Sequence, residues 1–314
     1  MSYLVLTDAD VLKFSRMTSM IDAIEHVFYE KAKGTLVSPP RFQLETEKGN
    51  LVFTAGAATG IEKVTGFRVY DTYNNDEQGH QQLVAVFDSE TGVFKGIVIG
   101  HALGAIRTGA IGGVAIKAMS RPDATQLAVI GSGTQARTQL EAACAARAIK
   151  QVKVYSRNDQ NRRKFAEEMT EKLGIEVLPV DSPKACVENA DIVICATNSR
   201  TPVLERDWLK QGVHINTVGP KSIKGSEIPI EIARQSSVIA TDSLEQLKAY
   251  STLHFLVDTP YEDHIVQLSD IVTGKMPGRT SDNDMTLFCS VGLSGTEVVI
   301  ANEIMKMAKE KTEV

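Results

Sequence analysis

The stretch VIGSGTQA, residues 129–136, has two glycines directly behind an apolar run and ahead of a helical one. A strand, this turn and a helix in succession are the context in which a glycine-rich loop binds a dinucleotide. Gly131 permits the sharp turn, Gly133 lets the backbone approach a pyrophosphate, and Ala136 is small enough for the helix to pack on the strand. The first amides and the positive end of the helix would hold the phosphates. The alternative is a strand-to-helix turn without a ligand.

Short apolar segments and helical stretches alternate around and beyond this turn. Strands are expected at residues 127–130, 152–155, 176–180, 192–196, 213–218 and 237–241. Such alternation is typical of a parallel, doubly wound sheet. We therefore predict an α/β protein with a Rossmann-type domain at residues 120–292.

The residues before this domain show a different pattern. Strands rich in β-branched and aromatic residues are expected at 51–54, 64–73 and 83–87, with a hairpin loop at 88–92. A helical segment follows at 101–119, and its several glycines indicate a close neighbour. We predict an α+β domain with a mostly antiparallel sheet at residues 1–119, completed by a C-terminal helix at 293–314.

Composition excludes several classes of function. Lys and Arg number 34 against 39 Asp and Glu, a net charge of -5 with both signs mixed along the chain, which gives no support to nucleic-acid or membrane-surface binding. We expect no targeting segment and no apolar run long enough to span a membrane. The six histidines lack metal-binding spacings, so no metal site is expected. Four separated cysteines are expected to be reduced core thiols of a cytoplasmic protein: Cys144, Cys186, Cys195 and Cys289.

The end of the second Rossmann strand indicates the coenzyme. NAD-preferring sites usually place an Asp or Glu about 20 residues past the glycines, whereas here the strand ends in Ser156 and Arg157. Arg157 is expected to pair with a 2′-phosphate, with Ser156 as a hydrogen-bond donor and Arg162 or Arg163 as helpers. We predict NADP, with NAD as the alternative coenzyme. An ordinary exposed arginine is the alternative reading of Arg157.

Five further stretches accompany the glycine turn along almost the whole chain. They read SPPR at 38–41, AIRTGA at 105–110, NTVG at 216–219, GR at 278–279 and FCSVGL at 288–293. With them, the sequence resembles the ornithine cyclodeaminase and mu-crystallin family of nicotinamide-dependent proteins. The resemblance implies a homodimer that pairs through the first domain, and chemistry between a substrate-binding and an NAD(P)-binding domain. It also implies action on a carbon that bears nitrogen next to a carboxylate.

The resemblance implies particular site residues. Arg41 and Arg107 match the family's carboxylate-binding arginines, and arginine forks can fix an amino or imino acid in two-point geometry. Structural ion pairs are the alternative for both, and an ordinary helical residue is the alternative for Thr108. The residues expected to contact the coenzyme are Thr108, Gly131, Gly133, Thr134, Gln135, Ala136, Ser156, Arg157, Thr197, Val218, Gly219 and Ser290.

Two positions depart from the family pattern. Arg68 stands where many members have a lysine, and a guanidinium is a poor proton donor. Lys221 stands where the cyclodeaminases and alanine dehydrogenases have an aspartate. We predict that Arg41, Arg68 and Arg107 hold the substrate carboxylate and that Arg68 and Arg107 take part in catalysis.

Lys221 is predicted to donate a proton or to bind a second carboxylate, with a surface lysine as the alternative. Glu227 is the nearest acid that could replace the lost aspartate. Glu297 falls where the family's last helix has an acid. The alternative is that it only stabilises the N-terminus of that helix.

These features together predict an NAD(P)H-dependent oxidoreductase that acts on the C–N bond of a small imino or amino acid. Loss of the aspartate removes the partner of a substrate ammonium group, which argues against ornithine as substrate. Ornithine cyclodeaminase, and a crystallin-like NADPH-binding protein without turnover, remain the alternatives. The sequence does not identify the substrate's side chain.

Overall fold

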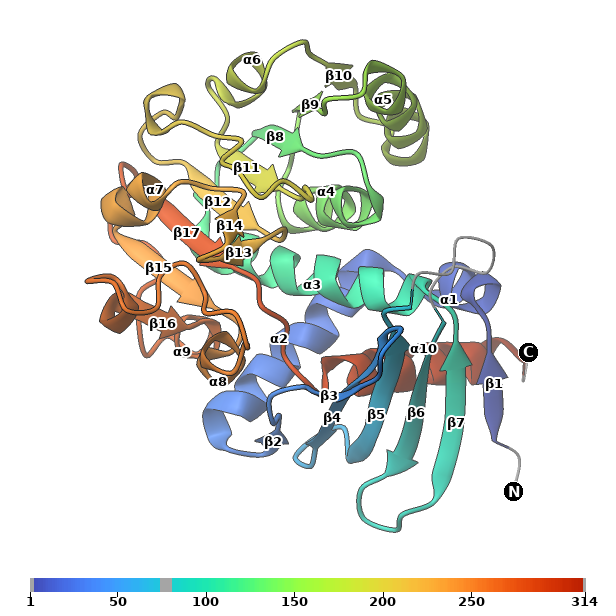
Figure 1. Ribbon diagram of the computed structural model, residues 1–314. Helices are drawn as coiled ribbons and strands as arrows, with labels where there is room; N and C mark the ends of the chain where they lie inside the picture. The colour runs from blue at the N-terminus through green and yellow to red at the C-terminus, as the bar shows by residue number, and fades with distance from the viewer. Residues whose placement is uncertain (1–2, 74–80, 313–314) are drawn as a thin grey trace. The chain divides into compact units, whose positions relative to one another are not determined.

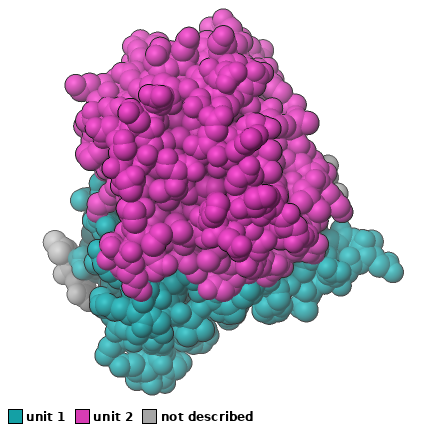
Figure 2. Space-filling model, turned by 90° about the vertical axis from the view of Figure 1, so that its left-hand side faces the viewer, with its two compact units in different colours: residues 1–107, 292–314 teal, residues 108–291 magenta. Residues whose placement is uncertain are grey.

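The computed structural model describes residues 3–73 and 81–312, and it divides into two compact units. One comprises residues 1–107 and 292–314, and the other comprises residues 108–291 (Figure 2). The predicted boundaries after residues 119 and 292 therefore differ from those of the structure. The first boundary in the structure, after Arg107, falls inside helix α3 (Ala102–Met119).

Close packing explains why the second half of α3 belongs to the second unit. A Cβ at Gly109 would lie 2.7 Å from the Thr138 carbonyl oxygen, and one at Gly112 would lie 2.1 Å from Oε1 of Gln139. The Gln139 amide also donates to the carbonyl of Thr108 over 2.9 Å. The glycines of this helix thus have the close neighbour that the sequence predicted.

The first unit is built on a seven-stranded sheet with the order β1-β7-β6-β5-β4-β2, in which β3 also pairs with β4. All paired neighbours are antiparallel except β1, which runs parallel to β7. The strands are β1 (Leu4–Leu6), β2 (Leu36–Val37), β3 (Phe42–Glu45), β4 (Asn50–Ala58), β5 (Val64–Asp71), β6 (Gln82–Asp88) and β7 (Phe94–Ile99). The helices are α1 (Asp8–Phe14), α2 (Met17–Lys33) and α10 (Thr296–Thr312).

Helix α10 lies on the sheet and against α2 (Figure 1). Glycines let it approach the strands, because a Cβ at Gly56 would lie 2.6 Å from the Cα of Gly295. The predicted hairpin loop joins β6 and β7, where Asp88 accepts hydrogen bonds from the amides of Glu90 and Thr91. The mostly antiparallel sheet and this hairpin are confirmed.

The second unit is an eight-stranded sheet, parallel throughout, with the order β10-β9-β8-β11-β12-β17-β15-β16. The strands are β8 (Gln126–Ile130), β9 (Gln151–Tyr155), β10 (Val177–Pro179), β11 (Ile192–Cys195), β12 (His214–Thr217), β15 (Val238–Thr241), β16 (Ile265–Gln267) and β17 (Thr286–Cys289). The helices are α4 (Thr134–Ala146), α5 (Asp159–Leu173), α6 (Pro183–Val187), α7 (Ile230–Gln235), α8 (Leu244–Lys248) and α9 (Leu268–Val272). A short hairpin, β13 (Lys221–Ser222) and β14 (Gly225–Ser226), follows β12. The doubly wound parallel sheet is confirmed.

One helix bears on the expectation that no segment spans a membrane. By length and composition, α3 could cross a bilayer, although no such segment was expected. Of this 18-residue helix, 78% is buried inside the protein. Burial of this kind is typical of the core helix of a folded domain.

Candidate functional site

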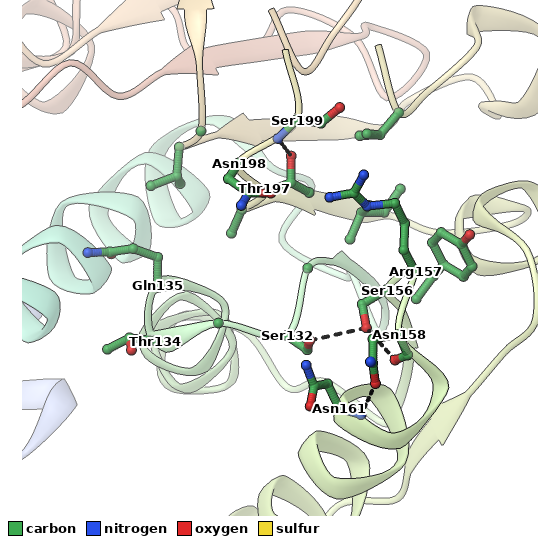
Figure 3. Close-up of a pocket in the computed structure, with 18 residues that line it drawn as sticks. Ser132, Thr134, Gln135, Ser156, Arg157, Asn158, Asn161, Thr197, Asn198 and Ser199 are labelled. Carbon is green, nitrogen blue, oxygen red and sulfur yellow. Dashed lines mark hydrogen bonds between the residues drawn. The ribbon is translucent and has the colours of Figure 1, made fainter. Parts of the chain in front are cut away.

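The glycine turn lines a pocket of about 850 Å³ at the carboxyl ends of β8, β9, β11 and β12 (Figure 3). The strand order reverses here, since β8 pairs with β9 on one side and β11 on the other. Doubly wound sheets bind their ligands at such a switch point. The pocket brings together nine of the predicted coenzyme residues: Gly131, Gly133, Thr134, Gln135, Ser156, Arg157, Thr197, Val218 and Gly219.

The glycine turn fits a dinucleotide for reasons that the structure makes specific. Gly131 has a φ of 120°, and a Cβ there would lie 2.2 Å from the Ala196 carbonyl oxygen. Gly133 is the N-cap of α4, gives no side-chain cap, and has no atom within 4 Å of its Cβ position. Gln135 lines the pocket, and its Oε1 is buried without a hydrogen-bond partner among the described residues. The helix amides and an orphaned acceptor thus face a space that a ligand can fill.

The remaining coenzyme candidates lie outside the residues that line the pocket. Ala136 lies in the first turn of α4 and is fully buried, as its packing role requires. Ser290 is buried, and its amide donates to the carbonyl of Thr217 over 3.1 Å. The carbonyl of Thr108 accepts from Gln139.

The end of β9 forms one side of the pocket. The Ser132 hydroxyl donates to the Ser156 hydroxyl over 3.1 Å, and Arg157 is exposed beside them (Figure 3). Of the two predicted helpers, Arg162 donates to the carbonyl of Ser156 over 3.1 Å. Arg162 pairs with Asp159 and Asp181, Arg163 also pairs with Asp159, and neither lines the pocket.

The first unit gathers three arginines around one buried carboxylate, Glu297 of α10. Arg107 of α3 contacts its Oε1 at 2.7 Å, and Arg68 of β5 approaches the same oxygen at 3.6 Å. Arg41 donates to the hydroxyl of Tyr70 over 3.5 Å, and the Arg68 guanidinium lies 4.5 Å above the Tyr70 ring. Among the described residues of this cluster, three positive charges face one negative charge, so the cluster suits an anion.

Gly292 shows where two of these arginines converge. A Cβ at this position would lie 2.8 Å from Nη2 of Arg41 and 3.4 Å from Nη1 of Arg107. The Nε of Arg107 is buried and has no hydrogen-bond acceptor among the described residues. Two guanidinium groups, one of which has an orphaned donor, therefore meet at a position where a side chain has no room.

Charge and burial both act on the cluster. Burial alone would raise the pKa of Glu297, but Arg107 and then Arg68 hold that pKa below its usual value. Burial lowers the pKa of Arg68; Glu297 opposes this change and Arg107 adds to it. Gln82 fixes Arg68 further, because its Oε1 accepts from Nε of Arg68 over 3.0 Å. Glu297 is thus an ionised carboxylate that holds the arginines in place.

Lys221 lies in the second unit, on β13. Its ammonium group donates to the carbonyl of Gly219, which lines the coenzyme pocket. His254 is close by, and burial and then the charge of Lys221 lower its pKa to about 3. Lys221 is half-buried, which does not fit a freely solvated surface lysine.

No group of three potential metal ligands occurs within residues 3–73 and 81–312. His80 lies outside those ranges. His214, expected to be a satisfied core residue, is fully buried with Thr286 and Asn216 both 2.8 Å from its ring nitrogens. The four cysteines are free, and three of them are buried.

The sequence model of the ornithine cyclodeaminase/mu-crystallin family matches residues 1–312. The chain belongs to this family. A Delta(1)-pyrroline-2-carboxylate reductase of Bacillus cereus is 30% identical, with 98% of this chain and 97% of that protein covered. Among solved structures, the Thermococcus litoralis Delta(1)-pyrroline-2-carboxylate reductase in complex with NADH and L-proline is 32% identical, with a TM-score of 0.87 over 98% of both chains. An archaeal alanine dehydrogenase dimer with bound NAD is 29% identical, with a TM-score of 0.88 over 99% of this chain and 98% of that one. These relatives share both units of this family member.

Proposed function

We propose that this family member is an NAD(P)-dependent oxidoreductase that acts on the C–N bond of a small imino or amino acid. The convergence of Arg41 and Arg107 above Gly292 carries the proposal. Such a fork holds a carboxylate at two points, and the buried Nε of Arg107 offers a further donor. The similar reductases and alanine dehydrogenase act on substrates in which nitrogen and a carboxylate share one carbon.

Each charged residue has a separate role in this proposal. Arg41 and Arg107 bind the carboxylate, Arg68 neutralises it further, and Glu297 holds Arg68 and Arg107 in place. When bound, a reduced nicotinamide supplies a hydride to the carbon of the C=N bond. The nitrogen then needs a proton, which Arg68 donates poorly. We assign that proton to Lys221, whose ammonium reaches the carbonyl of Gly219 at the pocket.

The coenzyme proposed is NADP, with NAD as the alternative. None of the described residues that line the pocket is an Asp or Glu, so no carboxylate repels a 2′-phosphate there. Arg157 is exposed at the end of β9 and able to pair with such a phosphate.

The charges of the first unit also argue against ornithine. An ornithine side chain brings an ammonium group, and the carboxylate of Glu297 is already used by Arg107 and Arg68. An imino acid brings no such group, and its carboxylate meets three guanidinium groups. Imine reduction is therefore the favoured direction of chemistry.

A homodimer through the first unit is proposed from the apolar face of its sheet. Gly66 and Gly96 face Val298 and Met305 of α10, so α10 covers one face. The opposite face carries Thr65 and Asp71 among many apolar side chains that are half-buried or exposed: Val5, Phe42, Leu44, Leu51, Phe53, Phe67, Val69, Leu83, Phe87, Ile97 and Ile99. A second copy of the chain suits this face, because the similar archaeal alanine dehydrogenase is a dimer.

We also propose a cytoplasmic location. Burial raises the pKa of Cys186 and of Cys289 to about 12, so both thiols stay protonated and unreactive. Four free cysteines are typical of a reducing compartment.

A substrate panel tests the proposed activity. Purified protein is mixed with NADPH or NADH and Δ1-pyrroline-2-carboxylate, pyruvate with ammonia, or an open-chain imino acid, and absorbance at the reduced nicotinamide band is followed. We expect oxidation with at least one imino acid and faster turnover with NADPH. Ammonia release from ornithine with catalytic NAD would instead establish the cyclodeaminase. Saturable NADPH binding with no oxidation across the panel would establish a binding protein.

A further inference from the structure

Glu227 is a fully buried carboxylate that links two loops of the coenzyme pocket. Its Oε2 accepts from the amide and hydroxyl of Thr197, over 2.9 and 2.8 Å, in the loop after β11. Its Oε1 accepts from the Thr217 hydroxyl at 2.7 Å and from the amides of Val218 and Gly219 at 3.1 and 2.6 Å, after β12. Each carboxylate oxygen thus accepts hydrogen bonds from one of the two loops.

Only a carboxylate satisfies this arrangement of donors. An ionised carboxylate accepts at both oxygens and donates at neither, so it can serve donors on two sides. An amide would turn a donor toward one of the loops, and a shorter acid would not reach both. Buried polar groups that lose their acceptor are costly, so the donors of both loops depend on Glu227.

Gly219 supports the same conclusion from the side of the loop. A Cβ there would lie 2.4 Å from Oε2 of Glu227 and 2.3 Å from the Thr197 carbonyl oxygen. The Thr197 hydroxyl donates to Glu227 and accepts from the amide of Ser199 over 3.1 Å (Figure 3). Thr197 therefore uses its hydroxyl to order its loop.

Glu227 also closes the hairpin that carries Lys221. Its amide donates to the carbonyl of Pro220 over 3.0 Å, and its carbonyl accepts from the amide of Val203 over 2.8 Å. The segment between Gly219 and Glu227 is thereby anchored at both ends, and β13 and β14 lie within it.

We propose that Glu227 is a positioning residue that fixes the nicotinamide side of the coenzyme pocket without touching the coenzyme. This inference rests on the proposed function. In a doubly wound sheet the adenosine half of a dinucleotide lies toward the second strand, here at Ser156 and Arg157, and the nicotinamide half lies on the other side of the switch point. Glu227 holds Thr197, Val218 and Gly219, which line that other side.

Binding of the whole coenzyme, compared with binding of its adenosine half alone, distinguishes a positioning role of Glu227 from a general effect on stability. Dissociation constants of NADPH and of 2′,5′-ADP are measured by fluorescence titration and calorimetry for the wild type and Glu227→Gln. We expect the NADPH constant of the variant to rise at least tenfold, about 1.4 kcal/mol, and that of 2′,5′-ADP to change less than about twofold. If the wild type prefers NADH, then NADH and 5′-AMP replace the two probes.

Glu30→Gln is the matched control. Glu30 is a buried carboxylate of the first unit that accepts from the amides of Gly60 and Ile61 over 3.0 and 2.8 Å. Its loss removes comparable backbone hydrogen bonds far from the coenzyme pocket in sequence. We expect this variant to bind both probes like the wild type.

Thr217→Val covers the case in which Glu227→Gln does not fold. It removes one donor to Glu227 from a residue that does not line the pocket, and a rise of roughly threefold in the NADPH constant alone is expected. Unchanged binding of both probes, or equal weakening of both, overturns the inference. A wild type that binds neither coenzyme refutes the proposed function instead.

Discussion

Replacing Glu297 by glutamine removes the carboxylate that Arg107 and Arg68 of the arginine cluster both contact. Arg107 lies 2.7 Å and Arg68 3.6 Å from the same oxygen of Glu297, which is 1% exposed. Glutamine keeps the shape and one acceptor but leaves the two guanidinium groups facing each other without a negative charge. The variant should therefore be much less stable than the wild type.

The expected loss follows from the burial of the pair. Two unit charges about 4 Å apart interact by about 4 kcal/mol at an effective dielectric constant near 20. Removal of one partner of a buried ion pair costs about 3–5 kcal/mol, and the acceptor retained by glutamine favours the lower end. At about 2–4 °C per kcal/mol, the melting temperature should fall by roughly 6–15 °C.

Thermal unfolding followed by circular dichroism measures this loss, with Glu90→Gln as control. Glu90 contacts Lys63 at 2.8 Å, but both side chains are at least half exposed, so we expect no measurable change. Because the pKa of Glu297 is below its usual value, its stabilising effect is present above the unfolded-state pKa near 4.3 and is lost as the pH falls through the lower folded-state pKa. Equal melting temperatures of the Glu297 variant and the wild type at pH 7 would refute the role of Glu297.

Four further outcomes are expected. Arg107→Ala should abolish NADPH oxidation with imino acids and leave the NADPH titration unchanged; lost coenzyme binding would contradict its place in the substrate cluster. Arg157→Ala should weaken the binding of NADPH at least about tenfold relative to the binding of NADH, because one charge-assisted hydrogen bond contributes about 1.5–3 kcal/mol. Equal weakening of both coenzymes would exclude recognition of the 2′-phosphate by Arg157. Phe42→Asp should convert a dimer to monomers in analytical ultracentrifugation, whereas Leu12→Asp, at an exposed position of α1, should leave the dimer intact. If both variants remained dimeric, this face would be excluded as the dimer interface. Burial lowers the pKa of His214 from 6.5 to about 3, so the unfolded chain binds a proton that the folded chain rejects. In urea unfolding, the wild type should therefore lose about 1.2 kcal/mol more between pH 6 and 5 than His214→Gln does, and equal losses would contradict this account.

The local sequence pattern was sufficient to predict most of the secondary structure of the second unit. The glycine turn, its strand and its helix appear where the spacing places them, because their signals lie within a few residues of one another. Strand β17 was missed, although it lies between β12 and β15 and is fully buried. Its four residues follow a polar loop, and its two partners are distant in the sequence, so nothing local indicates a central strand.

The candidate site shows the same division between local and distant contacts. Arg41, Arg68 and Arg107 were found by residue type and by resemblance. Glu297 was named as the acid of the last helix, but its role as counter-ion of Arg68 and Arg107 was not predicted, because it meets them only in the folded chain. The position of Glu227 eight residues after Gly219 carries no local signal that its carboxylate returns to that loop.

Glu297 and Glu227 are both buried carboxylates, yet different partners compensate their burial. Glu297 faces guanidinium groups, so its neutralisation leaves like charges together and should mainly reduce stability. Glu227 accepts from amides and hydroxyls of two loops, so glutamine there leaves no unpaired charge but releases the loops from each other. The two glutamine variants should therefore have different main effects. The change at Glu297 should lower the melting temperature more, and the change at Glu227 should weaken coenzyme binding more. If both variants altered both measurements in the same proportion, the assignment of different roles to these carboxylates would fail.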